Sequence, residues 1–225
     1  MFENIVGPVY FNESYSFDSN VVYIDCGDHQ VLVDTGTGLY PDMLDRALRD
    51  VGASLEGITD VVFTHSHIDH IGGVVHLLKN SGLRTYLHKS EADRINAGDM
   101  HLTLADTFGG TLPKFKISQP LEQDQVLSFG DIRLKVHHTP GHSIGSICLH
   151  EESLRLLITG DTMFPGGSFG RVDFPTGDPK QLVESLRRVA QIDFDIALAG
   201  HMGSIRHGGT RAALRSYEMA KAMFS

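Results

Sequence analysis

Apolar and polar residues follow one another in short blocks that predict strands and helices in turn. Two β-branched runs predict a hairpin over 21–26 and 30–34, whose turn should leave His29 in solvent. A helix is predicted between Pro41 and Gly52, because apolar residues recur there at helical spacing. The other predicted strands span 58–63, 84–88, 131–136, 146–150, 154–159 and 196–199. The other predicted helices begin at Val74, Ser90 (expected to cap its helix), Asp178 and Thr210.

The same mixture of strands and helices runs through the whole chain without a linker or a repeat, which predicts one α/β domain over 1–225. The last helix, 210–224, is expected to turn Leu214, Tyr217 and Ala220 inward. The segment 99–119 is the one long stretch without a regular pattern. Such a segment is typical of a lid or substrate-binding loop, or of a variable surface insertion.

Composition indicates a soluble globular protein. The chain has 225 residues, 41% of them hydrophobic and 21% charged, and a net charge of −9. No basic stripe is visible, so we expect a small-molecule substrate and no nucleic-acid partner. Residues 1–13 do not resemble a signal peptide and no apolar run could cross a bilayer, so we expect a cytoplasmic location without membrane association. Cys26 and Cys148 lie in apolar runs and are interpreted as small buried residues.

The densest group of polar side chains follows the apolar run 61–63. His65, His67, Asp69 and His70 place three imidazoles and a carboxylate within six consecutive residues. Imidazole nitrogens and carboxylate oxygens are ligands of zinc and related metals, and a loop has no packing need for four such groups. This stretch therefore predicts a metal site at the end of a strand.

Three later strands lead to the same kinds of side chain. His142, Asp161 and His201 each follow a glycine near the end of a predicted strand. Glycine lets the backbone approach a site closely, and ligands at strand ends can converge on one rim of a sheet. We therefore expect these three residues to join the first four. His137 and His138 are left out, because neighbouring strand residues point to opposite faces and His142 fits the strand-end pattern better.

The motif His-x-His-x-Asp-His-x-x-Gly, followed in order by Gly-His, Gly-Asp and Gly-His, resembles the metallo-β-lactamase superfamily over nearly the whole chain. The resemblance implies an α/β fold, a four-layer αββα sandwich of two mixed β-sheets flanked by helices, with metals at one edge. It implies that Asp34, in an Asp-Thr-Gly loop, supports a ligand. It also implies two metal sites, in which His65, His67 and His142 bind the first ion, Asp69, His70 and His201 bind the second, and Asp161 bridges both.

Two zinc ions are the expected cofactors, although iron or manganese also accept such ligands. True β-lactamases have Cys where this chain has Asp161, which argues against β-lactam hydrolysis. The segments 138–146 and 160–174 are similar to the glyoxalase II group. Glyoxalase II proper adds a C-terminal helical domain that helps bind glutathione, whereas 24 residues follow His201 here, so the chain resembles the short glyoxalase II-like hydrolases.

The resemblance implies a metal-dependent hydrolase of thioesters or esters, in which a hydroxide bridging two metals attacks the substrate carbonyl. Asp69 is the expected catalytic residue as well as a ligand, because it could orient the attacking water or move its proton. Arg171 and Asp173 are expected to form a buried pair that braces the wall of the site.

Other enzymes of the same fold are alternatives. A mononuclear iron persulfide dioxygenase would use His65, His142 and Asp161, and a lactonase is a further possibility. A metal-storing or structural zinc protein is disfavoured, because seven ligands for two metals leave positions open to water. The substrate and the oligomeric state are left open by the sequence.

Overall fold

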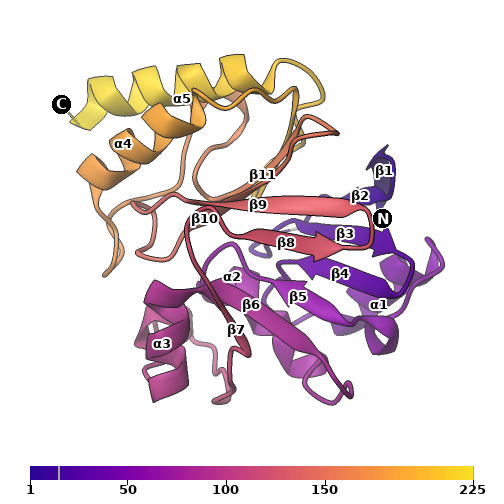
Figure 1. Ribbon diagram of the computed structural model, residues 1–225. Coiled ribbons are helices and arrows are strands. Elements are labelled where there is room, and N and C mark those ends of the chain that lie inside the picture. The colour runs from indigo at the N-terminus through magenta and orange to yellow at the C-terminus, as the bar shows by residue number, and fades with distance from the viewer. Residues whose placement is uncertain (15, 225) are drawn as a thin grey trace.

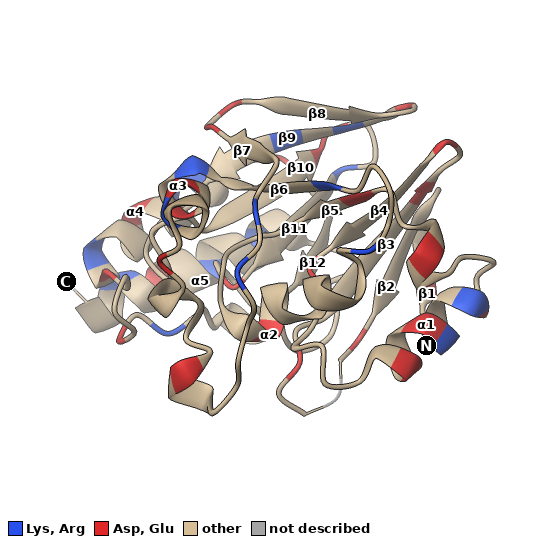
Figure 2. Ribbon diagram, turned by 90° about the horizontal axis from the view of Figure 1, so that it is seen from below, with Lys and Arg blue, Asp and Glu red and all other residues tan. Residues whose placement is uncertain are grey.

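Two β-sheets lie face to face at the centre of the molecule, with helices on their outer faces (Figure 1). The computed structural model describes residues 1–14 and 16–224. The helices are α1 (Pro41–Arg49), α2 (Ile68–Ile71), α3 (Lys89–Ala97), α4 (Pro179–Val189) and α5 (Gly209–Phe224). In Figure 1, α4 and α5 cover one sheet, and α1 and α3 lie against the other. Figure 2, turned by 90° from this view, shows acidic and basic residues interspersed along the ribbon. The predicted four-layer sandwich is therefore confirmed.

The larger sheet is mixed. Its strands, in order across the sheet, are β1 (Glu3–Val6), β2 (Val9–Asn12), β3 (Val21–Cys26), β4 (His29–Val33), β5 (Asp60–Val62), β6 (Arg84–His88) and β7 (Gln119–Leu121). Strands β1 to β4 pair antiparallel, whereas β4 to β7 pair parallel. The parallel strands all end at one edge, and β5 leads there directly into the segment that carries the first four candidate ligands.

The smaller sheet is also mixed. In order across the sheet it contains β12 (Ile196–Ala199), β11 (Leu156–Gly160), β10 (Ile147–Glu151), β9 (Ile132–His138) and β8 (Val126–Phe129). Strands β11 and β12 pair parallel, and the others pair antiparallel. The carboxyl ends of β11 and β12 therefore lie side by side, each followed by one of the predicted ligands.

Three hydrophobic cores hold the four layers together. In β5, Val61 packs with the core under α1 and α3, while its neighbour Val62 packs between the two sheets. In β11, Ile158 packs between the sheets, while Leu157 packs under α4 and α5. Because these central strands are apolar on both faces, they appear in the sequence as continuous apolar runs rather than alternating ones.

Several local expectations are wrong. His29 begins β4 rather than lying free in the turn, and its Nδ1 is 3.1 Å from the buried Asp60 carboxylate. The cap of α3 is His88, whose Nδ1 accepts a hydrogen bond from the Ser90 N–H, so Ser90 is not the cap. On α5, Leu214 is 46% exposed. Ala220 is buried as expected, together with Ala213 and Ser216, and Tyr217 is partly buried against the same core.

The irregular segment after α3 is anchored rather than loose. It contains two short 3₁₀ turns, η3 (His101–Thr103) and η4 (Asp106–Phe108), and its side chains Leu102, Leu104 and Phe115 are buried. The apolar pattern does not predict β1, β2, β7 and β8, which are only three or four residues long. The described residues include no helix with the length and apolar character needed to cross a membrane.

Candidate metal centre

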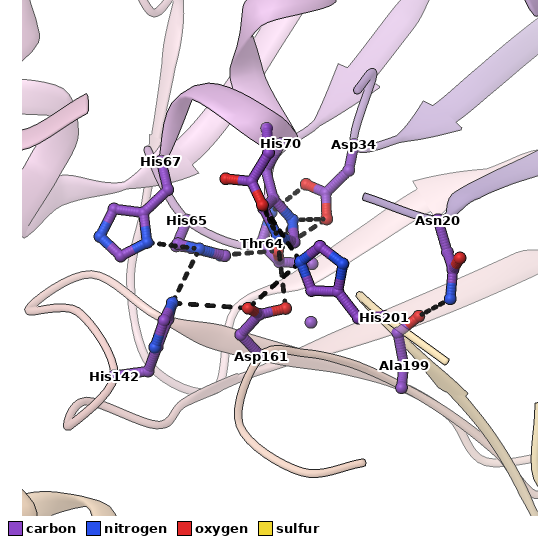
Figure 3. A network of polar contacts seen from close by, with 12 residues as sticks. Asn20, Asp34, Thr64, His65, His67, His70, His142, Asp161, Ala199 and His201 are labelled. Carbon is purple, nitrogen blue, oxygen red and sulfur yellow. Dashed lines mark hydrogen bonds and ion pairs between the residues drawn. The ribbon is translucent and has the colours of Figure 1, made fainter. Parts of the chain in front are cut away.

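The seven candidate ligands come together at the edge where the strands of both sheets end (Figure 3). Strand β5 leads to His65 and His67, and the short helix α2 carries Asp69 and His70. The loop from β9 to β10 supplies His142, and β11 and β12 lead to Asp161 and His201. The predicted convergence of four strand ends is therefore present, with ligands from both sheets.

The first cluster consists of three imidazoles. Nε2 of His65 lies 3.1 Å from Nδ1 of His67 and 3.2 Å from Nε2 of His142. Nitrogen ligands bound tetrahedrally to zinc at about 2.05 Å would be about 3.3 Å apart. The three nitrogens therefore have the spacing of ligands around one ion.

The second cluster combines two imidazoles with a carboxylate. Asp69 Oδ2 lies 3.1 Å from His201 Nε2 and 3.7 Å from His70 Nε2. Asp161 lies between the clusters: its Oδ1 is 3.3 Å from His70 Nε2, and its Oδ2 is 3.5 Å from His142 Nε2. One carboxylate thus faces nitrogens of both groups, as a bridging ligand requires.

Two buried atoms in this centre lack the hydrogen-bond partner that buried polar atoms normally have. Nε2 of His70 and Oδ1 of Asp161 face each other at 3.3 Å, but neither forms a hydrogen bond with the other or with any other described residue. Such atoms are costly inside a protein unless something else satisfies them. The donor set, nitrogen and carboxylate oxygen without sulfur, suits zinc and also iron or manganese. The residues present therefore fit divalent metal ions.

Electrostatics distinguishes the two clusters. Burial and the neighbouring imidazoles hold the pKa of His65 well below its ordinary value, and burial together with the imidazole of His142 lowers the pKa of His67 to about 3. These rings are neutral at pH 7 and offer lone pairs. Burial alone would lower the pKa of His70, but the carboxylates of Asp161, Asp34 and Asp69 raise it well above the usual value. The second cluster therefore favours positive charge.

The ligand rings are oriented through their other nitrogen. His70 Nδ1 donates a hydrogen bond of 2.7 Å to Asp34 Oδ2, which also accepts one of 2.7 Å from the Thr64 hydroxyl. His142 Nδ1 donates to the carbonyl oxygen of Arg171 at 2.6 Å, and His65 Nδ1 lies 3.1 Å from Thr64 Oγ1. These contacts keep the proton of each ring on Nδ1 and hold the ring so that its Nε2 faces the centre. The supporting role implied for Asp34 is present in the geometry.

The glycine before Asp161 and the glycine before His201 explain how these strand ends come so close. A Cβ on Gly160 would lie 2.7 Å from the Thr64 side chain, and Gly160 has a φ of +47°. A Cβ on Gly200 would collide with the Asp161 carboxylate and lie 2.7 Å from Cε1 of His70. Only glycine permits this approach.

Asn20 supports the site although nothing in its sequence neighbourhood identifies it. Its side-chain amide donates a hydrogen bond of 2.9 Å to the carbonyl oxygen of Ala199 (Figure 3). It donates a second one, of 2.6 Å, to the carbonyl oxygen of Met202, on the other side of His201. Its backbone N–H donates to the Gly200 carbonyl. Asn20 thus fixes the loop that presents His201.

Other polar residues lie elsewhere than expected. The Arg171–Asp173 pair exists, with Nη2 to Oδ2 at 2.6 Å, but both side chains are more than 60% exposed, so the expectation of a buried pair is wrong. What Arg171 contributes to the centre is its backbone carbonyl. His138 stacks on His88 with ring centroids 3.7 Å apart, and His137 lies near His150, so neither joins the clusters.

A cavity of about 480 Å³ lies between residues 12–14 and 18–19 on one side and α1 on the other. Its lining includes Tyr40, Met43 and Leu44 but none of the seven candidate ligands. It is separated from them by the 35–38 segment, whose Thr35 N–H donates to the His70 carbonyl at 2.8 Å. The metal centre itself opens to solvent at the partly exposed His201.

The sequence profile of the metallo-beta-lactamase superfamily matches residues 15–201, and the chain belongs to that superfamily. With its sandwich fold and its His and Asp clusters, it is a metal-dependent hydrolase of the metallo-β-lactamase fold. The chain is similar to acyl-coenzyme A thioesterase MBLAC2 of Bos taurus, at 31% identity over 76% of this chain and 69% of the relative. It is similar to the hydroxyacylglutathione hydrolase GloC of Haemophilus influenzae, at 31% identity over 63% of this chain and 67% of the relative. The crystal structure of TTHA1623 in a di-iron-bound form superposes with a TM-score of 0.74 at 27% identity, over 95% of this chain and 100% of that one.

Proposed function

We propose that this protein hydrolyses thioesters or esters with two metal ions held by the seven side chains of the centre. The observation that carries the proposal is the position of Asp161, whose two carboxylate oxygens face His70 and His142 in separate clusters. Two clusters joined by one carboxylate fit a pair of ions better than a single one. We propose zinc as the metal. The di-iron form of TTHA1623 makes iron the main alternative.

Metal ions bound there would supply a Lewis acid for the substrate carbonyl and a water of lowered pKa as nucleophile. The protein's part is to orient that water. Although burial alone would raise its pKa, the imidazoles of His70 and His201 lower the pKa of Asp69, which is therefore a carboxylate at neutral pH. Its Oδ2 faces His201 at 3.1 Å, which leaves Oδ1 to accept a hydrogen bond from the water. We assign Asp69 this positioning role in addition to binding metal.

The choice of thioesters is supported by two relatives whose names describe hydrolysis of an acyl-coenzyme A and of a hydroxyacylglutathione. Both reactions break a carbonyl–sulfur bond, so that bond is the shared chemistry. The free thiols of Cys26 and Cys148 suit a reducing compartment, and we propose that the enzyme acts in the cytoplasm.

The test is hydrolysis by pure, zinc-loaded protein of S-lactoylglutathione and of simple thioesters, esters and lactones. Turnover should require two metals per chain, and His67→Ala and Asp161→Ala should each abolish it while the far-UV circular dichroism spectrum is kept. Absence of turnover on every compound would refute the proposal.

One specific observation keeps a persulfide dioxygenase as the second candidate. His65, His142 and Asp161 also form a set of two imidazoles and one carboxylate, with His65 and His142 nitrogens 3.2 Å apart. One iron per chain together with oxygen consumption on a persulfide would favour this candidate. Two metals per chain would exclude it.

A further inference from the structure

Three phenylalanines from three different loops form a continuous line that begins at the metal centre. We call Phe174, Phe108 and Phe17 the phenyl ridge. The ring of Phe174 meets the imidazoles of His67 and His142 edge to face, with centroids 5.4 and 6.3 Å apart. Phe108 is 6.0 Å from Phe174, and Phe17 is 4.8 Å from Phe108.

The ridge is exposed, although aromatic rings of this size are normally buried. Phe17 and Phe108 are each 43% exposed. Aromatic pairs contribute favourable contacts of their own, yet half-exposed phenyl rings beside a reactive centre leave apolar surface in water that a ligand could cover. Arg171 lies over one face of Phe174, with Cζ 4.6 Å from the ring centroid, and its charge is compensated by Asp173 at 2.6 Å.

Each part of the ridge is tied to a segment that carries candidate ligands or the loop beside them. Next to Phe17, Asp18 accepts a hydrogen bond of 2.8 Å from Thr37 N–H, and the Ser19 N–H donates to the Asp69 carbonyl at 3.0 Å. Before Phe174, the Gly170 N–H donates to the Asp161 carbonyl at 2.9 Å.

The loop that carries Phe108 is closed by its own hydrogen bonds. The Phe108 N–H donates to Leu104 and the Gly110 N–H to Ala105, and both acceptor residues are buried. These bonds define the conformation of the Phe108 loop, while backbone hydrogen bonds tie the segments of Phe17 and Phe174 to Asp69 and Asp161.

We propose that the phenyl ridge binds the hydrocarbon chain of the acyl group, so that the preferred substrates are thioesters of unbranched medium-chain fatty acids. This inference rests on the proposed function for its chemistry. With the scissile carbonyl at the metal centre, a chain leaving it past His67 and His142 meets Phe174 first, then Phe108 and Phe17. Phenyl rings offer apolar surface along a line but no hydrogen-bond donor or acceptor group of the kind that a hydroxyacyl group would use. The ridge thus favours an alkanoyl over a lactoyl group.

Two series of compounds test the ridge, and only one of them depends on turnover. The first is kcat/KM for acetyl, butanoyl, hexanoyl and octanoyl thioesters of one thiol. Each added methylene should raise kcat/KM about two- to fourfold until the ridge is covered. The second is the Kd of zinc-loaded protein for the corresponding free carboxylates, measured by calorimetry. It should fall by a similar factor per methylene.

Variants locate the effect on the ridge. Phe108→Ala and Phe17→Ala should each cut the octanoyl-to-acetyl ratio in both series at least fivefold. Phe108→Leu, which keeps apolar area, should retain most of it. Leu214→Ala is the matched control, because Leu214 is similarly exposed, at 46%, but lies on α5. It should leave both ratios unchanged.

The outcomes separate the ridge from the proposed function. Chain-length dependence of Kd that Phe108→Ala removes supports the ridge even if no thioester is cleaved, in which case only the proposed function fails. Two results overturn the ridge: a ratio that does not change along the series, or a chain-length dependence that persists in both alanine variants. The proposal would likewise be overturned if the wild type formed a dimer that Phe108→Ala disrupts while the Kd ratios stay unchanged. The ridge would then be a contact between two copies of the chain.

Discussion

Replacing Asp34 by asparagine should weaken metal binding at the second cluster, although Asp34 is not a candidate ligand. Its Oδ1 accepts from the Thr64 N–H at 2.8 Å, and its Oδ2 accepts from the Thr64 hydroxyl and from His70 Nδ1. An asparagine amide placed toward the Thr64 N–H would set donor against donor. The amide must therefore turn toward His70. His70 Nδ1 then has to accept, and its proton moves to Nε2, the atom that faces the metal centre.

The expected loss can be estimated from contacts of this type. Removing the partner that orients a metal-bound imidazole typically costs about 10- to 100-fold in metal affinity, or about 1.4 to 2.7 kcal/mol. Asp34 is 2% exposed, so water does not replace the lost acceptor. The first cluster contains no ring that bonds directly to Asp34. Its affinity should therefore change by less than the second cluster's.

Competition with a chromophoric zinc chelator, fitted to two sites, measures both affinities. His201→Ala and His67→Ala identify which binding constant belongs to which cluster. Asp60→Asn is the matched control: Asp60, in β5, is a buried aspartate like Asp34, but it accepts hydrogen bonds from Arg84 and Tyr86. The reasoning is refuted if D34N binds both ions like the wild type. It is also refuted if D60N weakens the second site equally, because the cause would then be general destabilisation.

Three further predictions use other features of the structure. Gly200→Ala should lose the second metal, because its Cβ would collide with Asp161 and His70, whereas Gly110→Ala, which meets nothing closer than 3.7 Å, should keep two metals per chain by elemental analysis. Removal of metal by a chelator should abolish hydrolysis and lower the Tm measured by calorimetry, and an unchanged Tm would mean that the clusters bind no ion in the folded state. Burial and His138 lower the pKa of His88 to about 4, so the folded state disfavours the charged form of this ring. The contribution of His88 to the free energy of unfolding should therefore be fully present above pH 6.5 and decrease as the pH falls toward 4. In His88→Phe this part of the acid slope in urea titrations should be missing, and an unaltered slope would contradict the assignment.

The candidate ligands could be predicted from the sequence because metal chemistry needs particular residue types at strand ends, and the strands themselves were apolar on both faces. His142, Asp161 and His201 each follow a glycine, a local signal that survives without any knowledge of the fold. The blocks of apolar residues predicted one α/β domain, whereas the sandwich of two sheets was implied by the resemblance to the superfamily. Short edge strands such as β1 and β7 carried too few residues to show a period.

The supporting residues could not be found in this way. Asn20 holds the loop of His201 through a hydrogen bond to Ala199, which lies 179 residues away in the sequence. The residues that adjoin Asn20 in the sequence are ordinary polar residues without a recognisable signal. Arg171 supports His142 through its backbone carbonyl, which carries no side-chain signal at all. The phenyl ridge shows the same limit, since Phe17, Phe108 and Phe174 come from three loops whose packing the sequence pattern does not define.

The position of the centre links metal binding to the packing of the two sheets. His65 and His70 follow β5 of the larger sheet, whereas Asp161 and His201 follow β11 and β12 of the smaller one. Each cluster combines ligands from both sheets, so neither exists until the sheets have packed. In the absence of metal, the carboxylates around His70 are held close together at a cost in repulsion, and an ion that relieves it stabilises only the packed sandwich. Metal binding and sheet packing are therefore thermodynamically linked. A substitution that weakens metal binding should also lower the stability of the metal-loaded sandwich, and one that weakens the packing should also lower the metal affinity.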